Sequence, residues 1–395
     1  MADLNAMFAE ATSGERPSIL GVVAVAVNSD GNTIVASTAG KTNLDSAVAK
    51  AMDKDSVFAL ASCTKIITAI AALRLVEHGQ ISLDDASVVA KHIPELCQQN
   101  VITSTPGQPL TFEERKKPIT VRQLLTHTSG SGADILDPRL IAWRKARGEP
   151  PMHLSAALPD AIALPNLFQP GEGWAYGGGS DWVGLLISRI SGEGLDEWMR
   201  KEIFDVVGCD ERIGFSKKKI EETGEKVVQV VTTTKAGELR EHHVPEQKSE
   251  RGGGGLYSSA NNFAKILADL VSPSPKILSP KTLDILFAPQ LDEGSIALTT
   301  FHSQSSMFMT GPLTTSLSLS AVNHALGGLL VTKDNPALGK SKGTMSWGGA
   351  FGSLWFVNRE QGVGAFYGGS MFPPGDAKSG ELMGAFIREV WGKVG

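Results

Sequence analysis

Two runs of β-branched and small apolar residues lie near the start of the chain, Ile19 to Val27 and Thr33 to Ser37, separated by Asp30-Gly31. An aspartate followed by a glycine readily supplies the positive φ angles of a tight hairpin turn. The pattern therefore predicts an antiparallel hairpin. Residues 1–11, ahead of it, are weakly amphipathic and predict a short surface helix.

A longer apolar stretch follows, from Phe58 to Leu73. It predicts a helix that Ser62 opens and that runs to about His78, where Gly79 is well suited to the position just after a helix end.

The region from about residue 80 to 250 is broken by prolines at positions 94, 106, 109, 118, 138, 150, 151, 159, 165 and 170. Proline interrupts both helices and strands, so this region is expected to be an insertion of short helices and loops that lines a pocket, without a second sheet. Helical spacing predicts helices at 119–125, capped by Thr120, and at 182–190. Residues 227–234 are strand-like, and the four glycines 252–255 predict a hinge or a tight backbone approach.

Sequence patterns typical of β-strands occur again in the C-terminal part of the chain. Short apolar runs at 326–332, 344–347, 352–358 and 362–367, with turn residues between them, predict an antiparallel meander. Residues 258–270 predict a helix capped by Ser258 or Ser259, and residues 379–391 a terminal helix capped by Ser379. The Ser- and Thr-rich stretch 290–322 is expected to be a long loop.

These elements predict an α/β protein of the α+β kind, in which an antiparallel sheet is flanked by helices and joined to an all-α region. The sheet domain is expected to be discontinuous, formed by residues 1–79 and 251–395. Residues 80–250 are expected to be a mainly helical insertion that forms one wall of the active site.

Composition narrows the range of partners. Hydrophobic residues make up 42% and charged residues 20%, and the net charge of -5 comes from 37 basic and 42 acidic residues. Such a balance is typical of a globular protein and argues against nucleic-acid and membrane partners. Three cysteines, Cys63, Cys97 and Cys209, are too few for a disulfide framework and fit a reducing compartment. The N-terminal stretch lacks the features of a signal peptide, so the cytoplasm is the expected location.

The candidate chemistry centres on Ser62 and Lys65. Residues i and i+3 share one face of a helix, so the hydroxyl and the amine are expected to lie side by side. Serine needs an adjacent base to act as a nucleophile, and burial of Lys65 would disfavour its charged form. The backbone N–H of Ser62, at the helix start, could stabilise an oxyanion.

Two further segments could complete such a site. Tyr176 lies in the glycine-rich stretch 173–182, just before a predicted helix, where a phenol could relay a proton. Residues 343–351 read as a strand with adjacent glycines, and the Ala350 N–H is a candidate second oxyanion donor. Taken alone, Tyr176 could equally be a core residue and the glycines a strand bend. The chain has no G-x-S-x-G elbow, so an α/β-hydrolase would lack its nucleophile. His242-His243 lies in a polar segment without spaced partners, so no metal site is predicted, and no cofactor is expected.

Together, Ser62-Cys63-Thr64-Lys65, Tyr176-Gly177-Gly178 and Trp347-Gly348-Gly349 resemble the three boxes of the serine β-lactamase and penicillin-binding-protein superfamily. Residues 124–130 resemble a run found in its class C β-lactamase-like esterase branch. The resemblance covers about residues 15–390 and implies the β-lactamase-like fold. It also implies Ser62 as nucleophile, Lys65 as base and Tyr176 as proton shuttle, with an oxyanion hole formed by the N–H groups of Ser62 and Ala350.

Departures from the β-lactamase pattern point to the substrate. Trp347 stands where β-lactamases carry the lysine of Lys-Thr-Gly, and Gly178 stands where class C enzymes carry asparagine. Both changes resemble family VIII carboxylesterases and, through Tyr-Gly-x-x-x-Asp-Trp-x-Gly, the fungal lovastatin-pathway acyltransferases. Candidate substrate-binding residues are Trp347, Gly348, Gly349, Phe351, Trp174 and Trp143.

The expected function is serine-dependent acyl transfer or hydrolysis of a small-molecule, secondary-metabolite-like ester. The partners would be an ester or acyl donor, with an acyl-carrier domain as one donor option, and an alcohol acceptor or water. A β-lactamase or D,D-peptidase is the alternative within the superfamily. A non-catalytic binding protein on the same fold is the alternative from another class.

Overall fold

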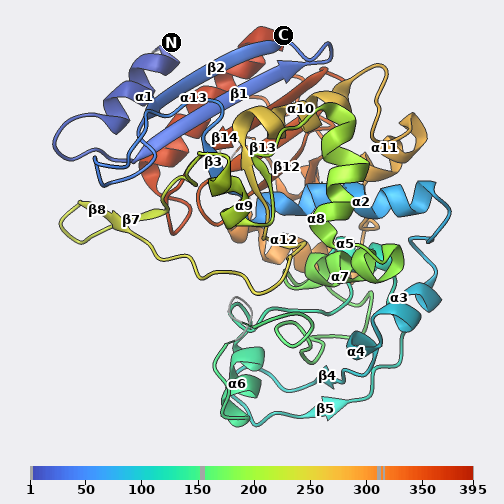
Figure 1. The fold of residues 1–395 in the computed structure, drawn as a ribbon. Coiled ribbons are helices and arrows are strands. Elements are labelled where there is room, and N and C mark those ends of the chain that lie inside the picture. Colours follow the sequence, from blue (N-terminus) through green and yellow to red (C-terminus); the bar gives the residue numbers. More distant parts are fainter. Residues whose placement is uncertain (1–2, 152–155, 309–312, 315, 395) are drawn as a thin grey trace.

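The computed structural model describes residues 3–151, 156–308, 313–314 and 316–394 (Figure 1). Its central element is a seven-stranded antiparallel sheet with the strand order β10-β11-β12-β13-β14-β1-β2. The strands are β1 (Gly21–Asn28), β2 (Thr33–Gly40), β10 (Val322–His324), β11 (Leu329–Val331), β12 (Met345–Gly348), β13 (Leu354–Asn358) and β14 (Val363–Gly368). The first two strands thus join the last five, so the predicted antiparallel sheet, built from both ends of the chain, is confirmed.

Strand β1 lies inside the sheet between β14 and β2, which explains its continuous apolar run. Its side chains alternate between two cores: Val23 and Val25 pack in the larger core, while Val22 and Ala24 pack in the smaller one. The hairpin with β2 is confirmed, with a register shift next to Val27.

Helices cover both faces of the sheet (Figure 1). On one face, α1 (Leu4–Thr12) and α13 (Ala377–Val394) form the smaller core, to which Phe8 and Phe386 contribute. On the other face, α10 (Ala260–Val271) contacts β1 and β14, and its N-cap is Ser259. Ser379 is not the cap of the terminal helix, because α13 begins at Ala377 and the Ser379 N–H donates to the Asp376 carboxylate.

Helix α2 (Thr64–Glu77) runs between the sheet and the helices α7 and α8, and most of its residues are buried. A single 3-10 turn, η1 (Ala61–Cys63), precedes it, so Ser62 lies one turn before the helix proper. The predicted helix is confirmed, and its burial on all sides explains why its sequence shows little amphipathicity.

The span from about residue 80 to 210 is built from short helices, most of which lie at the end of the molecule away from the sheet (Figure 1). These elements are α3 (Ala86–His92), α4 (Pro94–Cys97), α5 (Val121–Leu125), α6 (Pro138–Ala146), α7 (Gly179–Ser191), α8 (Leu195–Met199), the π-helical turn η2 (Arg200–Phe204) and η3 (Asp205–Val207). The helices predicted at 119–125 and 182–190 are confirmed as α5, with a Thr120–Gln123 capping box, and α7.

The expectation that the middle of the chain contains no further sheet is wrong. Among the described residues, two small antiparallel sheets, β4-β5 and β7-β8, lie within residues 80–250, and a third, β3-β9-β6, takes β6 from this region. Their bounds are β3 (Val57–Ala59), β4 (Val101–Ile102), β5 (Phe112–Glu113), β6 (Ile213–Gly214), β7 (Val231–Thr233), β8 (Leu239–Glu241) and β9 (Tyr257–Ser259), with helix α9 (Lys217–Glu222) after β6. Each strand has only two or three residues, too few to show an alternating pattern.

The expected loop at 290–322 is also wrong in its described part. It contains α12 (Ile296–Ser303), the 3-10 turns η4 (Ser305–Met307) and η5 (Leu319–Ala321), and the start of β10; residues 309–312 and 315 lie outside the described residues. Helix α11 (Pro280–Phe287) precedes this stretch. Among the described helices, none is long and apolar enough to cross a membrane.

Candidate active site

The turn that carries Ser62 is held in an uncommon backbone conformation. Ala61, directly before it, has a φ of 44°, in the left-handed region that costs a non-glycine residue about 1–3 kcal/mol. Thr64, fully buried, secures the turn: its hydroxyl donates to the Ala61 carbonyl at 2.7 Å and accepts from the Leu256 N–H at 3.1 Å. The turn therefore presents Ser62 at a fixed angle ahead of α2.

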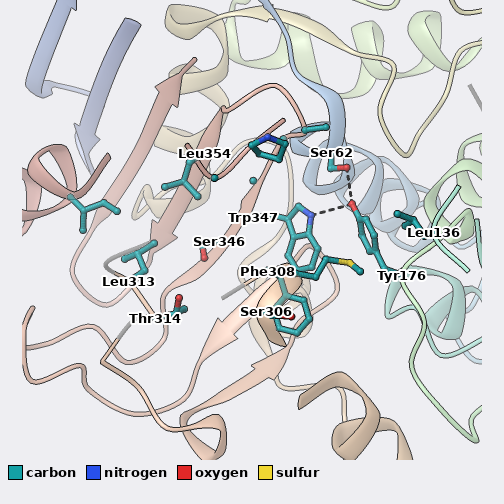
Figure 2. A pocket seen from close by; sticks show the side chains of 17 residues that line it. Ser62, Leu136, Tyr176, Ser306, Phe308, Leu313, Thr314, Ser346, Trp347 and Leu354 are labelled. Atoms are coloured by element: carbon teal, nitrogen blue, oxygen red, sulfur yellow. Dashed lines mark hydrogen bonds between the residues drawn. The ribbon is translucent and has the colours of Figure 1, made fainter. Parts of the chain in front are cut away.

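The side chains of Lys65 and Tyr176 both contact the hydroxyl oxygen of Ser62. Lys65 Nζ lies 3.1 Å and the Tyr176 hydroxyl 2.7 Å from Ser62 Oγ. The Tyr176 hydroxyl also accepts from Trp347 Nε1 at 3.3 Å, so the three sequence boxes meet at this point (Figure 2). The Lys65 amine comes from α2 and the Tyr176 phenol from the segment before α7, and both contact the Ser62 hydroxyl. Trp347 of β12 contacts the phenol in turn. This arrangement is suited to proton transfer.

The Lys65 amine is oriented by a hydrogen bond to the backbone of the glycine run 252–255. Its Nζ donates to the Gly253 carbonyl at 2.5 Å, and the Gly253 N–H donates to Asp181 at 2.7 Å. Asp181 also forms a buried ion pair with Arg251 at 2.9 Å. A side chain on Gly252 would collide with the Ser180 carbonyl, so the predicted tight backbone approach is confirmed. Asp181 and Arg251 thereby fix the acceptor that orients the Lys65 amine.

A cavity of about 340 Å³ opens at Ser62. Five other residues predicted for the site line it: Tyr176, Trp347, Gly348, Gly349 and Ala350. Gly349 is required because a Cβ there would collide with the Leu60 carbonyl, which keeps the end of β12 against the Ser62 turn. Ser62 and Ala350 thus lie on the same cavity, as the predicted oxyanion donors would have to.

Three of the predicted substrate-binding residues are not among those lining this cavity. Trp143 lies on α6, where the guanidinium groups of Arg144 and Arg147 stack on its ring. Trp174 is 1% exposed and packs behind Tyr176, with ring centroids 6.3 Å apart. Phe351 contacts Phe372. An aromatic residue type alone does not show which way a ring points.

Sequence reasoning missed several residues of the site. They are the cavity-lining Leu136, Ser306, Met307, Phe308, Leu313, Thr314, Ser346, Leu354, Pro374, Gly375 and Ile387. Most come from loops or from elements that meet only in the folded chain. The one available signal was in β12, where Ser346 precedes the Trp347-Gly348-Gly349 box.

Cys63, next to the nucleophile, lies outside the cavity. It is fully buried, and burial raises the pKa of its thiol well above the ordinary value. A thiol that stays protonated is a poor nucleophile, so Cys63 acts as a packing residue of the core.

Two buried histidines lie behind Tyr176. The His127 ring is 4.9 Å from the Tyr176 ring and 5.6 Å from the His324 ring, centroid to centroid. Within the described part of the chain, both ring nitrogens of His324 and Nδ1 of His127 lack a hydrogen-bond partner. Burial lowers the pKa of His127 well below its usual value, and burial lowers the pKa of His324 to about 4. Both rings therefore remain neutral near neutral pH.

This burial predicts a loss of stability in acid. Between pH 6.5 and about 4 the unfolded chain binds a proton at His324 that the folded chain does not, so the free energy of unfolding falls as the pH falls. Over pH 7 to 4 the wild type should lose about 3 kcal/mol more than His324→Leu. Urea unfolding at several pH values measures this difference. His243→Leu, at an exposed histidine, should leave the slope unchanged; equal slopes for His324→Leu and wild type would contradict the prediction.

Comparison with known proteins gives the family. The sequence profile of the family described as Beta-lactamase matches residues 9–380, and the chain belongs to this family. The chain is 32% identical over 418 aligned residues to the acyltransferase calJ of Penicillium decumbens, covering 99% of this chain and 98% of that protein. It is 30% identical to the lovastatin esterase of Penicillium rubens, covering 95% of each.

The fold agrees with a solved structure. The unliganded simvastatin synthase LovD of Aspergillus terreus matches with a TM-score of 0.86 at 25% identity, covering 99% of this chain and 98% of that one. The predicted family and the β-lactamase-like fold are therefore confirmed.

Proposed function

We propose that this protein is a serine enzyme that moves an acyl group from a small-molecule ester to an alcohol or to water, through an ester formed on Ser62. The observation that carries the proposal is the meeting of the Lys65 amine and the Tyr176 hydroxyl at Ser62 Oγ, inside the cavity. The names of the relatives, one an acyltransferase and one an esterase, support both outcomes.

The proposed reaction has two half-steps. Ser62 Oγ attacks the ester carbonyl carbon and gives its proton to Lys65, while the carbonyl oxygen receives hydrogen bonds from the N–H groups of Ser62 and Ala350. The bond to the leaving alcohol then breaks, and the proton reaches that alcohol through the Tyr176 hydroxyl. An alcohol or water next attacks the Ser62 ester by the reverse path, which restores the free serine.

The lining of the cavity supports a neutral, apolar ester as substrate. No charged side chain is present among the described residues that line it. Trp347 presents an indole ring at the position where β-lactamases carry the lysine of their Lys-Thr-Gly box. Phe308 stacks on this ring, with ring centroids 5.8 Å apart. Such a wall offers apolar contact area and no cation for a substrate carboxylate.

The test is covalent labelling followed by turnover. A fluorophosphonate probe should increase the mass of the intact protein by that of one covalent adduct. Peptide mapping should locate this adduct on Ser62, and the Ser62→Ala variant should form none. A p-nitrophenyl ester with a competing alcohol should then yield free acid, new ester or both, and the ratio separates hydrolase from transferase. Rapid nitrocefin turnover with negligible ester turnover would favour the β-lactamase alternative, and an absent adduct would support a binding protein.

Removing the Tyr176 hydroxyl tests its role as proton shuttle. Tyr176→Phe is expected to lower kcat/KM by about 10²-fold for alkyl esters, whose leaving alcohol needs a proton, and by less for p-nitrophenyl esters, whose leaving group does not. Steady-state rates with ethyl and p-nitrophenyl butyrate measure the difference. Tyr257→Phe, outside this cavity, serves as the matched control, and an equal loss with both esters would show that Tyr176 does not deliver the proton.

We propose a cytoplasmic enzyme in which residues 1–79 and 251–395 supply Ser62, Lys65 and β12, and residues 80–250 supply Tyr176. An acyl-carrier domain is one donor option; comparing a carrier-bound thioester with the same acyl group on p-nitrophenol tests whether a carrier raises the acylation rate.

A further inference from the structure

The cavity that begins at Ser62 does not end at Trp347. It continues to Leu313 and Leu354, on the other side of the β12 backbone (Figure 2), and Ile387 of α13 also lines it. Trp347 packs in the core on the α2 side of the sheet, whereas these three side chains pack in the core beneath α1 and α13. One continuous cavity therefore passes from the catalytic face of the sheet to its opposite face.

The passage lies at the free end of β12. Strand β11 pairs with β12 only at Met345 and Ser346, so the next two residues have a neighbouring strand on one side only. Side chains alternate along a strand, so a side chain at Gly348 would point to the same face as Ser346, toward the far end of the cavity. Among the described residues, a Cβ at Gly348 would meet only the Ser353 carbonyl oxygen, at 3.5 Å, so the missing side chain leaves room for the passage.

The far end, which we call the rear chamber, is lined by Leu313, Thr314, Ser346, Leu354 and Ile387. Its surface is mostly hydrocarbon, and its two hydroxyl residues are each less than a tenth exposed. The whole cavity, at about 340 Å³, lies at the small end of the range of about 300–1,000 Å³ that is typical of ligand pockets. Only part of a large ester fits in it, and the part that reaches the rear chamber must be narrow and apolar.

We propose that the rear chamber binds the hydrocarbon chain of the ester and sets the preferred chain length. This inference rests on the proposed function, since the chain must be attached to the carbonyl group that Ser62 attacks. The chain could belong to the acid or to the alcohol half of the ester. Burial of each added methylene should raise kcat/KM by about fourfold until the chamber is full.

The experiment uses two series of esters: p-nitrophenyl esters from acetate to decanoate, which lengthen the acid, and alkyl acetates from methyl to octyl, which lengthen the alcohol. Ile387→Trp fills the chamber, so the rise of kcat/KM with chain length should stop several methylenes earlier in one of the two series. Ile387→Ala should extend the same rise. The series that shifts identifies which half of the ester occupies the chamber.

Leu382→Ala is the matched control. Leu382 is buried on α13 in the same core as Ile387 but is not among the residues lining the cavity, so this variant carries a core defect without changing the chamber. Its chain-length profile should equal that of the wild type. If Ile387→Trp does not fold, Ile387→Ala and Gly348→Val, which narrows the passage, give the same test.

Either of two results with the variants would overturn the inference. Unchanged profiles in both series for the folded Ile387 variants would show that no chain enters the chamber. Equal losses for short and long esters would show that the substitutions disturb Ser62 instead. If the wild type is acylated at Ser62 with rates independent of chain length, only this inference fails; if no ester or probe labels Ser62, the proposed function fails with it.

Discussion

Replacing Lys65 with alanine is expected to lower the rate constant for acylation of Ser62 by about 10²- to 10⁴-fold, the usual contribution of a positioned general base. Lys65 Nζ lies 3.1 Å from Ser62 Oγ and is the amine placed to take its proton. The burst of p-nitrophenol in stopped-flow experiments measures acylation directly, separately from the later transfer to alcohol or water.

Lys65 also donates to the Gly253 carbonyl, so the alanine variant removes a structural contact as well as a base. Two further variants separate these roles. Lys65→Met keeps the bulk without the amine and should be as slow as alanine. Lys65→Arg keeps a cation able to donate to Gly253 but cannot accept a proton at working pH, so it should also be slow. Near-normal acylation by Lys65→Arg would contradict the base assignment.

Signals that are local in sequence predicted most of the sheet and the elements next to the site. The β1–β2 hairpin follows from Asp30-Gly31 between two β-branched runs, and α2 follows from a long apolar stretch that ends at Gly79. The helix α12 was missed because its Ser- and Thr-rich surroundings resembled a loop, although Ser295 caps it. The strands β3, β6 and β9 were missed because two or three residues acquire strand geometry only from partners far along the chain.

In the candidate site, too, local sequence motifs could be predicted, whereas contacts between distant segments could not. Ser62, Lys65, Tyr176 and Trp347 could be predicted because each lies in a short motif. In the structure Lys65 and Tyr176 contact the Ser62 hydroxyl, and Trp347 contacts the Tyr176 hydroxyl. The cavity walls were not found, because Leu354 and Ile387 come from elements whose contact depends on the whole fold. The same holds for the Asp181–Arg251 pair, which joins residues 70 positions apart. The glycine run predicted a close backbone approach but not the partner it approaches.

Replacing Asp181 with alanine is expected to cost both stability and rate. Its side chain and that of Arg251 are 3% and 5% exposed, so removing the carboxylate leaves a buried guanidinium unpaired, at a cost of about 3–5 kcal/mol in the free energy of unfolding. The Gly253 N–H loses its acceptor as well, which frees the carbonyl that orients Lys65. A small misplacement of a catalytic group can lower the rate by about 10²-fold.

Matched variants separate the two effects, with acylation rates taken at a temperature where every variant is folded and stability taken from urea unfolding. Asp181→Asn keeps an oxygen for the Gly253 N–H but loses the charge, so it should lose stability and keep more of the rate than alanine. Glu202→Ala removes a buried carboxylate that pairs with Arg74 and His78, away from Ser62, and should cost stability without slowing acylation of the folded protein. If Asp181→Ala is destabilised but acylates as fast as Glu202→Ala, the orientation of Lys65 does not depend on Asp181, and the helix α2 alone sets the position of the amine.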